Sequence, residues 1–213
     1  MSRENELLRH GRSLWRLATP YLATALLVAC DLGVTNPGRI EDEALNNATA
    51  MGPLVTGMAG DFATIYDNMA YFMGIASGEI THSGAFETEQ FLARGEIEPR
   101  HVNGMWGQMH RARWVAEQGL ARMQTVLGDA FTSSALAAEA NLWAGFANRM
   151  LGENVCVSVF DGGPPGDVLD YFRRAETNFT DAMAMAQAAG STAATLRTAA
   201  YGGRAQVRAA LGD

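Results

Sequence analysis

Residues 140–152 read ANLWAGFANRMLG, and residues 175–182 read AETNFTDA. In both stretches apolar residues recur three and four positions apart, which is the spacing of one face of an α-helix. The first stretch is rich in alanine and glycine, and the second places Phe179 between two alanines. Small residues allow two helices to approach closely, and an aromatic ring can fill the gap between them. The two stretches therefore predict a pair of closely packed helices and, with them, an all-α fold.

The pair resembles a tetratricopeptide repeat, a helical hairpin that stacks into an α-α superhelix, although a longer insertion, Glu153 to Asp170, replaces the usual turn. The pattern starts again at Ala199-Ala200-Tyr201-Gly202 and runs to Ala210-Leu211-Gly212-Asp213. An unpaired repeat helix leaves its apolar face exposed. We therefore expect tetratricopeptide-like hairpins with long loops, and either a chain truncated at its carboxy terminus or a second chain that covers the last helix.

Helical spacing extends over other segments of the chain. It predicts a helix from about Gly52 to Gly78, with a short turn before Pro53, and a long, partly ordered loop over residues 79–103. Further helices are expected at about 104–127, 132–152, 167–189 and 192–211. Val155–Phe160 is the one apolar run of strand length, and a single short segment cannot form a sheet.

The first thirty residues have the layout of a secretory signal. Four arginines precede an uncharged apolar stretch, residues 17–29, of 13 residues. This stretch is short for a membrane-spanning helix, which needs about 20 residues. It ends in Leu27-Val28-Ala29-Cys30, which resembles the lipobox of bacterial lipoproteins. The alternative is an ordinary amino-terminal helix with a chance buried cysteine.

The lipobox implies a division of the chain. Residues 1–29 are expected to form a lipoprotein signal peptide, and Cys30 is the expected site of lipidation. Residues 30–40 contain Gly, Pro and Asn, and they are predicted to be an extended tether. Residues 41–213 then form the helical domain. The lipid would place the protein at a membrane, and Asp31 after the cysteine does not decide which one.

The charge of the chain restricts its partners. The whole sequence carries a net charge of −7. Removing residues 1–29 takes away four arginines and two glutamates, which leaves 12 basic and 21 acidic residues, a net charge of −9. This charge disfavours binding to nucleic acid or to anionic lipid headgroups, so the lipid alone should link the protein to the membrane. The absence of lysine excludes Schiff-base catalysis and a Walker phosphate loop.

Candidates for metal binding and catalysis are weak. His82, His101 and His110 do not show the spacing of zinc ligands, so no metal and no cofactor are expected. The segment 161–167, DGGPPGD, could hold calcium, but a rigid turn with Asp167 as a helix cap is the favoured interpretation, because it explains these residues without an ion. Glutamates in the 79–103 loop could supply the carboxylate pair of a glycosidase, but a solvated loop is the simpler interpretation, and no catalytic residue is expected.

Aromatic residues are the better candidates for ligand contacts. Phe86 and Phe91 lie in the polar 79–103 loop, where they could bind a ligand or anchor the loop to the core. Trp106, His110 and Trp114 follow one another at steps of four, which places them on one helical face. We expect that face to be packed, with one hydrogen-bonded histidine. Cys156 is the only cysteine after Cys30, and it is either buried or available to a partner.

The order of these features resembles the SusD/RagB family. The closest matches are residues 32–58, the segment from Trp106 to Met123, and LGENVC at 151–156 leading into DGGP at 161–164. The resemblance implies an outer-membrane lipoprotein, facing the periplasm or the surface, without catalytic residues. Such a protein captures an oligosaccharide or a peptide and associates with a TonB-dependent, SusC-like outer-membrane transporter. The alternative is a periplasmic tetratricopeptide-type scaffold lipoprotein that holds protein partners, and an enzyme is a third, less favoured reading.

Overall fold

Six α-helices make up most of residues 40–213, the part of the chain that the computed structural model describes. They are α2 (Met51–Ser77), α3 (Glu87–Ala93), α4 (Pro99–Leu127), α5 (Ala135–Asn154), α6 (Leu169–Ala189) and α7 (Ala194–Leu211). No strand occurs in these residues, and the single β contact is an isolated bridge between Ser158 and Gly166. The all-α prediction is confirmed. The predictions for residues 1–39, which include the signal peptide, the lipidation of Cys30 and the tether, lie outside the described part.

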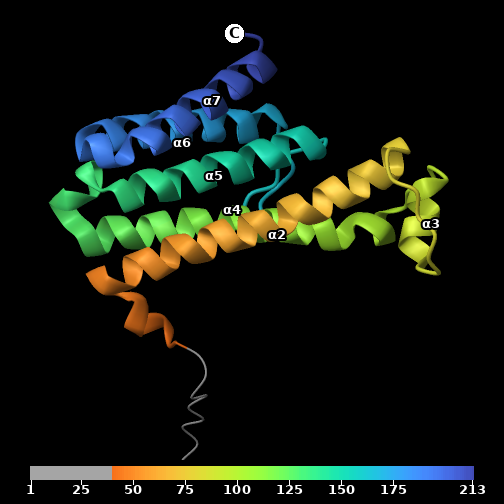
Figure 1. Ribbon diagram of the computed structural model, residues 1–213, viewed down its shortest axis with the longest axis horizontal. Helices are drawn as coiled ribbons and strands as arrows, with labels where there is room; N and C mark the ends of the chain where they lie inside the picture. Colours follow the sequence, from red (N-terminus) through yellow and green to blue (C-terminus); the bar gives the residue numbers. More distant parts are fainter. Residues whose placement is uncertain (1–39) are drawn as a thin grey trace, which may run out of the picture. The chain divides into compact units, whose positions relative to one another are not determined.

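The helices of the unit Asp42–Asp213 pack in sequence order. The long helices α2 and α4 lie side by side, α5 packs on both, α6 packs on α5, and α7 packs on α6 (Figure 1). The short helix α3 lies at the end of α2 and α4 that projects beyond α5 (Figure 1). Within residues 40–213 no helix is both long enough and apolar enough to cross a membrane.

The predicted helix boundaries agree with the structure except at the start of α4. Gly78 ends α2 with a φ of 78°, the left-handed conformation that glycine adopts most readily. The long 79–103 loop is shorter than predicted, because it contains α3 and because α4 begins at Pro99 rather than near residue 104. The side chains of Glu98 and His101 cap each other's backbone N–H groups, and proline is favourable in the first turn.

The predicted close approach of two helices is present around Phe179. This ring is fully buried on α6, and it lies between two glycines, Gly145 on α5 and Gly203 on α7. A Cβ atom added to Gly145 would lie 2.7 Å from the ring, and one added to Gly203 would lie 2.5 Å from it. The small residues therefore let three helices close on one aromatic ring. The assignment of these helices to the tetratricopeptide family stays a prediction.

The last helix buries one face and exposes the other. Ala200 and Val207 of α7 are fully buried against α6, while Tyr201 projects from the opposite face and is exposed. That a further element or chain covers this face also stays a prediction.

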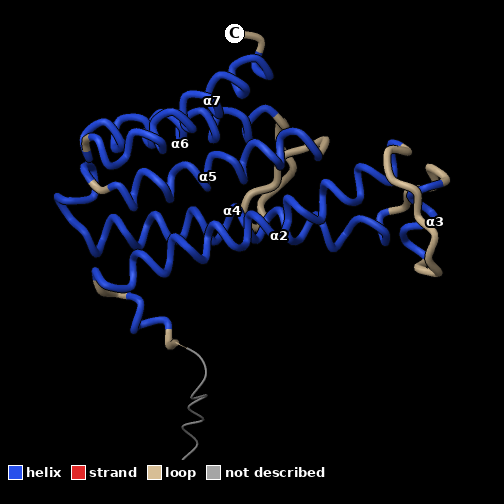
Figure 2. The backbone as a smooth tube through the Cα atoms, viewed as in Figure 1, coloured by secondary structure: helices blue, strands red, loops and turns tan. Residues whose placement is uncertain are grey.

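The insertion between α5 and α6 forms a loop that reaches back to α4. This α5–α6 loop, residues 155–168, leaves the end of α5, passes beside α4 and returns to α6 (Figure 2). Its turn includes Asp161, the only non-glycine residue of the described part with a positive φ, at 51°. The crossing matters for function because the loop forms one wall of a cleft beside α4.

Candidate functional site

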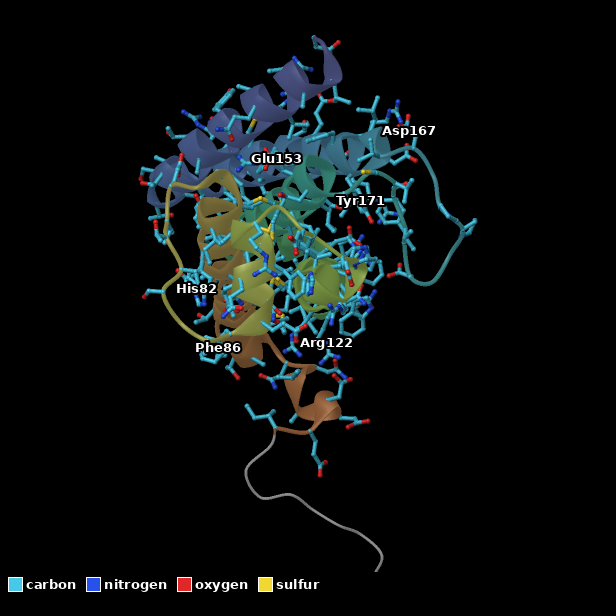
Figure 3. The ribbon with its side chains drawn as sticks, turned by 90° about the vertical axis from the view of Figure 1, so that its right-hand side faces the viewer. His82, Phe86, Arg122, Glu153, Asp167 and Tyr171 are labelled. Atoms are coloured by element: carbon cyan, nitrogen blue, oxygen red, sulfur yellow. The ribbon has the colours of Figure 1, made fainter. Side chains whose placement is uncertain are left out.

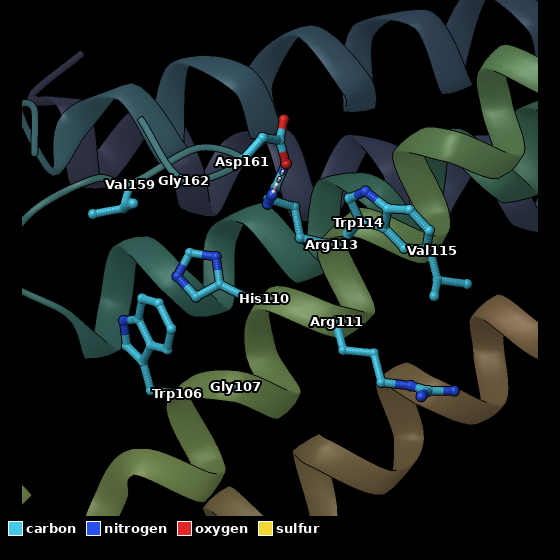
Figure 4. A pocket seen from close by; sticks show the side chains of 10 residues that line it. All are labelled: Trp106, Gly107, His110, Arg111, Arg113, Trp114, Val115, Val159, Asp161 and Gly162. Atoms are coloured by element: carbon cyan, nitrogen blue, oxygen red, sulfur yellow. Dashed lines mark hydrogen bonds and ion pairs between the residues drawn. The ribbon is translucent and has the colours of Figure 1, made fainter. Parts of the chain in front are cut away.

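A cleft of about 510 Å³ lies between α4 and the α5–α6 loop. We call it the α4 cleft (Figure 4). Clefts of this size are typical of small-ligand sites. Helix α4 supplies one wall and the loop supplies the other. The residues used below are Trp106, His110, Arg113 and Trp114 from α4, and Val159 and Asp161 from the loop.

Two tryptophans border the cleft and remain open to solvent. Trp106 is 46% exposed and Trp114 is 52% exposed. They lie on one face of α4, with His110 between them, and the Trp106 and His110 rings are 4.2 Å apart. The expected packed face is wrong for the two tryptophans. The buried stripe of α4 lies one position away, at Met105, Met109, Ala112 and Ala116. The same stripe can be recognised in the sequence, and it would have placed the tryptophans outside the core.

A buried arginine fixes the loop to α4. Arg113 is only 2% exposed, and it donates hydrogen bonds to Glu117 at 2.5 Å and to Asp161 at 2.7 Å. A buried charge is costly unless it is paired, so the two carboxylates are needed to stabilise the buried guanidinium of Arg113. The hydrogen bond from Arg113 also holds the pKa of the Asp161 carboxyl below its ordinary value. No local pattern predicted this pair, because 48 residues separate its members.

A second arginine completes the cluster. Arg174 of α6 lies 3.7 Å above the ring of Phe160, a cation–π contact, and its guanidinium is 3.3 Å from Glu117. Arg113, Glu117, Asp161 and Arg174 together form an arginine–carboxylate cluster with two positive and two negative groups. The cluster connects the loop to α4 and α6. Because it carries no net charge, it does not make the cleft strongly cationic or anionic.

His110 lines the cleft beside this cluster, and Tyr171 of α6 contacts it. The buried Tyr171 hydroxyl accepts a hydrogen bond from the Val159 N–H at 2.9 Å and donates one to the Val159 carbonyl at 2.8 Å. His110 Nε2 lies 3.4 Å from the same hydroxyl. Burial, and then the charge of Arg113, lower the pKa of His110 below its ordinary value. The imidazole is therefore neutral at neutral pH.

A second hollow continues along α4 beyond Trp114. It measures about 690 Å³, and its lining includes Leu54 and Arg122 as well as Trp114 and Val115, which it shares with the α4 cleft. Arg122 is held there by an ion pair with Asp42 at 2.6 Å. Trp114 therefore stands between two hollows, and the surface along α4 can accommodate an extended ligand.

The predicted contact residues, Phe86 and Phe91, lie away from this cleft. Phe86 is 72% exposed, and with His82 it is well separated from Tyr171 (Figure 3). Phe91 is half-buried, stacked at 4.6 Å on His101, with the guanidinium of Arg94 4.7 Å from its ring. Phe91 thus anchors α3 to α4, while Phe86 has the exposure that a ligand contact requires. Ligand binding at either residue stays a prediction.

The acidic turn already has partners for its carboxylates. Asp161 pairs with Arg113, and Asp167 accepts a hydrogen bond from the Leu169 N–H at 3.0 Å. The N-cap of α6 is Val168, which makes no side-chain cap, so Asp167 bonds the first turn of α6 from one residue earlier than a cap. Among residues 40–213 no three His, Cys, Asp or Glu side chains gather in a way that could hold a metal ion. Cys156 is exposed as a free thiol at the start of the loop.

No protein-family model, no curated protein and no solved structure matches this chain. The class of protein is therefore defined by fold and site alone. It is an all-α protein with a solvent-open cleft between two tryptophans and a charge-compensated cluster.

Proposed function

We propose that this protein is a lipid-anchored outer-membrane protein that captures an oligosaccharide or a peptide for a TonB-dependent, SusC-like transporter. The observation that carries the proposal is the pair of half-exposed tryptophans on either side of His110 and the arginine–carboxylate cluster. A tryptophan ring provides flat apolar surface for a sugar ring or an apolar side chain. The polar groups between the rings can then orient hydroxyl or amide groups of the ligand.

The electrostatics favour a ligand with little net charge. The cluster is neutral as a whole, and the part of the chain after residue 29 has a net charge of −9. A strongly anionic ligand would be repelled at long range. The hollow beyond Trp114 supports a chain-like ligand rather than a single small unit, because both hollows share that ring.

The membrane and transporter parts of the proposal are supported by the sequence. The lipobox at Cys30 and the order of motifs through the α5–α6 loop resemble a SusD/RagB protein. These parts need tests of their own. Cys30→Ser should leave an unlipidated precursor that no longer fractionates with membranes, and unchanged fractionation would contradict the anchor. Full protection from added protease on intact cells would contradict a surface-facing capture protein.

Ligand binding is tested by calorimetry on the detergent-solubilised full-length protein. The panel contains maltoheptaose, xylohexaose and uncharged hexapeptides. We expect at least one class to bind, and Trp106→Ala and Trp114→Ala each to weaken binding roughly 10- to 100-fold, the equivalent of about 1.5–3 kcal/mol of lost apolar burial. Tyr201→Ala removes an equally exposed aromatic ring on α7 and should have no effect.

Two results would contradict this assignment. If no member of the panel binds, the capture function fails for these ligand classes. If Phe86→Ala weakens binding and both tryptophan variants do not, the ligand is held at the α2–α3 loop instead of the α4 cleft.

A periplasmic scaffold is the second candidate, and one observation favours it. The end of the molecule that carries α3 exposes several large apolar side chains, namely Met73, Ile80, Phe86 and Ile97. Exposed apolar side chains that gather in one region are typical of protein–protein contacts. Crosslinking in cells separates the two functions. A partner lost with Phe86→Ala and kept with Trp106→Ala would favour a scaffold.

A further inference from the structure

The Tyr171 hydroxyl fixes where the hydrogens lie around it. A phenol has one hydrogen to donate, and the 2.8 Å contact with the Val159 carbonyl uses it. The phenol oxygen accepts from the Val159 N–H at 2.9 Å, which leaves capacity for one more donor. His110 Nε2 lies 3.4 Å from this phenol oxygen. Two bare lone pairs would repel each other, so this contact is favourable only when Nε2 carries a hydrogen.

The other nitrogen of His110 is then an acceptor. A neutral imidazole carries a single N–H, so a hydrogen on Nε2 leaves Nδ1 bare. Nδ1 makes no hydrogen bond to the described residues, and it is not among the buried side-chain atoms that lack a partner. His110 lines the α4 cleft between Trp106 and the loop (Figure 4). Nδ1 is therefore the nitrogen without a protein partner, on a side chain that lines the cleft, and it is open to a ligand there.

The surrounding charges act on this imidazole from three elements. Arg113 on α4 disfavours its protonation, Asp161 on the loop favours it, and burial outweighs Asp161. Tyr171 on α6 is neutral, because burial raises its pKa above the ordinary value. Glu117 pairs with both Arg113 and Arg174.

We propose that Tyr171 is a positioning residue that holds His110 with its hydrogen on Nε2, so that Nδ1 accepts a hydrogen bond from a ligand in the α4 cleft. That this cleft binds a ligand rests on the function proposed above. The contact selects ligands that place a hydroxyl or N–H group between the tryptophans. It rejects ligands that place a carboxylate, phosphate or ether oxygen there. Protonation in acid puts a hydrogen on Nδ1 and turns the acceptor into a donor, so that a carboxylate or ether oxygen is then accepted there.

Nitrogen NMR on the ¹⁵N-labelled full-length protein tests the tautomer without any ligand. His110→Gln assigns the His110 signals. The expected result is a protonated Nε2 and a bare Nδ1 in the wild type, with the two nitrogen signals moving toward each other in Tyr171→Phe. His101 is an internal control, because its Nδ1 accepts the Glu98 N–H at 3.1 Å and is independent of Tyr171. Tyr66→Phe, on an exposed tyrosine of α2, is the control variant.

Two small probes test the selectivity. Phenol and anisole share an aromatic ring, and only phenol donates a hydrogen bond. We expect phenol to bind roughly two- to tenfold more tightly than anisole at pH 7.5, which is the effect of one hydrogen bond. The preference should disappear in His110→Phe and at a pH where the His110 signals show protonation.

The outcomes separate this inference from the capture function. A hydrogen on Nδ1 in the wild type, or an unchanged His110 tautomer in Tyr171→Phe, overturns the role of Tyr171. Equal binding of phenol and anisole, or binding of neither, overturns the acceptor role of Nδ1. If the probes behave as expected while no oligosaccharide or peptide binds, the capture function fails and the inference stands.

Discussion

Gly202 and Gly203 are neighbours on α7, and the structure predicts opposite effects when each is changed to alanine. A Cβ atom at Gly202 would meet nothing within 4 Å, whereas one at Gly203 would lie 2.5 Å from two carbon atoms of the Phe179 ring. Alanine in place of glycine stabilises a helix interior by about 0.5–1 kcal/mol. Gly202→Ala should therefore stabilise the protein by about this amount.

Gly203→Ala adds the same helix preference and a collision. The Phe179 ring has little room to move, because it is fully buried and Gly145 of α5 also packs closely against it. Overpacking of a core costs about 1–3 kcal/mol, and a contact of 2.5 Å belongs at the upper end of that range. After the helix gain is subtracted, Gly203→Ala should lower the free energy of unfolding by about 1–2 kcal/mol.

Thermal unfolding followed by circular dichroism measures both changes. For a chain of this size 1 kcal/mol corresponds to about 2–4 °C in Tm. Gly203→Ala should lower Tm by roughly 2–8 °C, and Gly202→Ala should raise it by roughly 1–4 °C. If Gly203→Ala is neutral or stabilising, α7 does not press on Phe179, and the packing of the last three helices described above is wrong.

Three further predictions concern the site and α3. Arg113→Met should lower the free energy of unfolding by about 1–3 kcal/mol and speed amide hydrogen exchange at Val159, because the α5–α6 loop loses its buried anchor. Unchanged exchange would show that Tyr171 alone holds the loop. Because the pKa of His110 is lowered in the folded protein, the unfolded chain binds a proton first as the pH falls. The free energy of unfolding should therefore decrease below about pH 6.5 and level off once the folded imidazole is protonated. His110→Gln should flatten this slope in urea melts at several pH values. Phe91→Ala should release α3 and be visible as faster proteolysis of that segment, with the α4 cleft unaffected; loss of binding at the cleft would refute their independence.

Local periodicity was enough to predict the helices. The spacing of Leu54, Met58, Ile65 and Met69 marks α2, and Gly78 ends it, because helix formation and termination depend on residues within a few positions of each other. The start of α4 was missed because the reciprocal cap between Glu98 and His101 does not follow the usual capping pattern of a serine or threonine followed by a glutamate.

The site depends on contacts between distant segments, and the sequence could place only part of it. That Trp106, His110 and Trp114 share a face followed from their spacing. Whether that face is covered was decided by how α5 and the α5–α6 loop pack, and the loop left both tryptophans half-open.

The sequence by itself determined the fold class and most helix boundaries, because these depend on periodicity along the chain. Only the tertiary structure decided that Arg113 would be buried against Asp161, 48 residues away, and that Tyr171 would bind Val159 beside His110. The physical reason is that a buried charge or hydrogen-bonding group is stable only when another part of the chain supplies its partner, and no local sequence pattern predicts that partner.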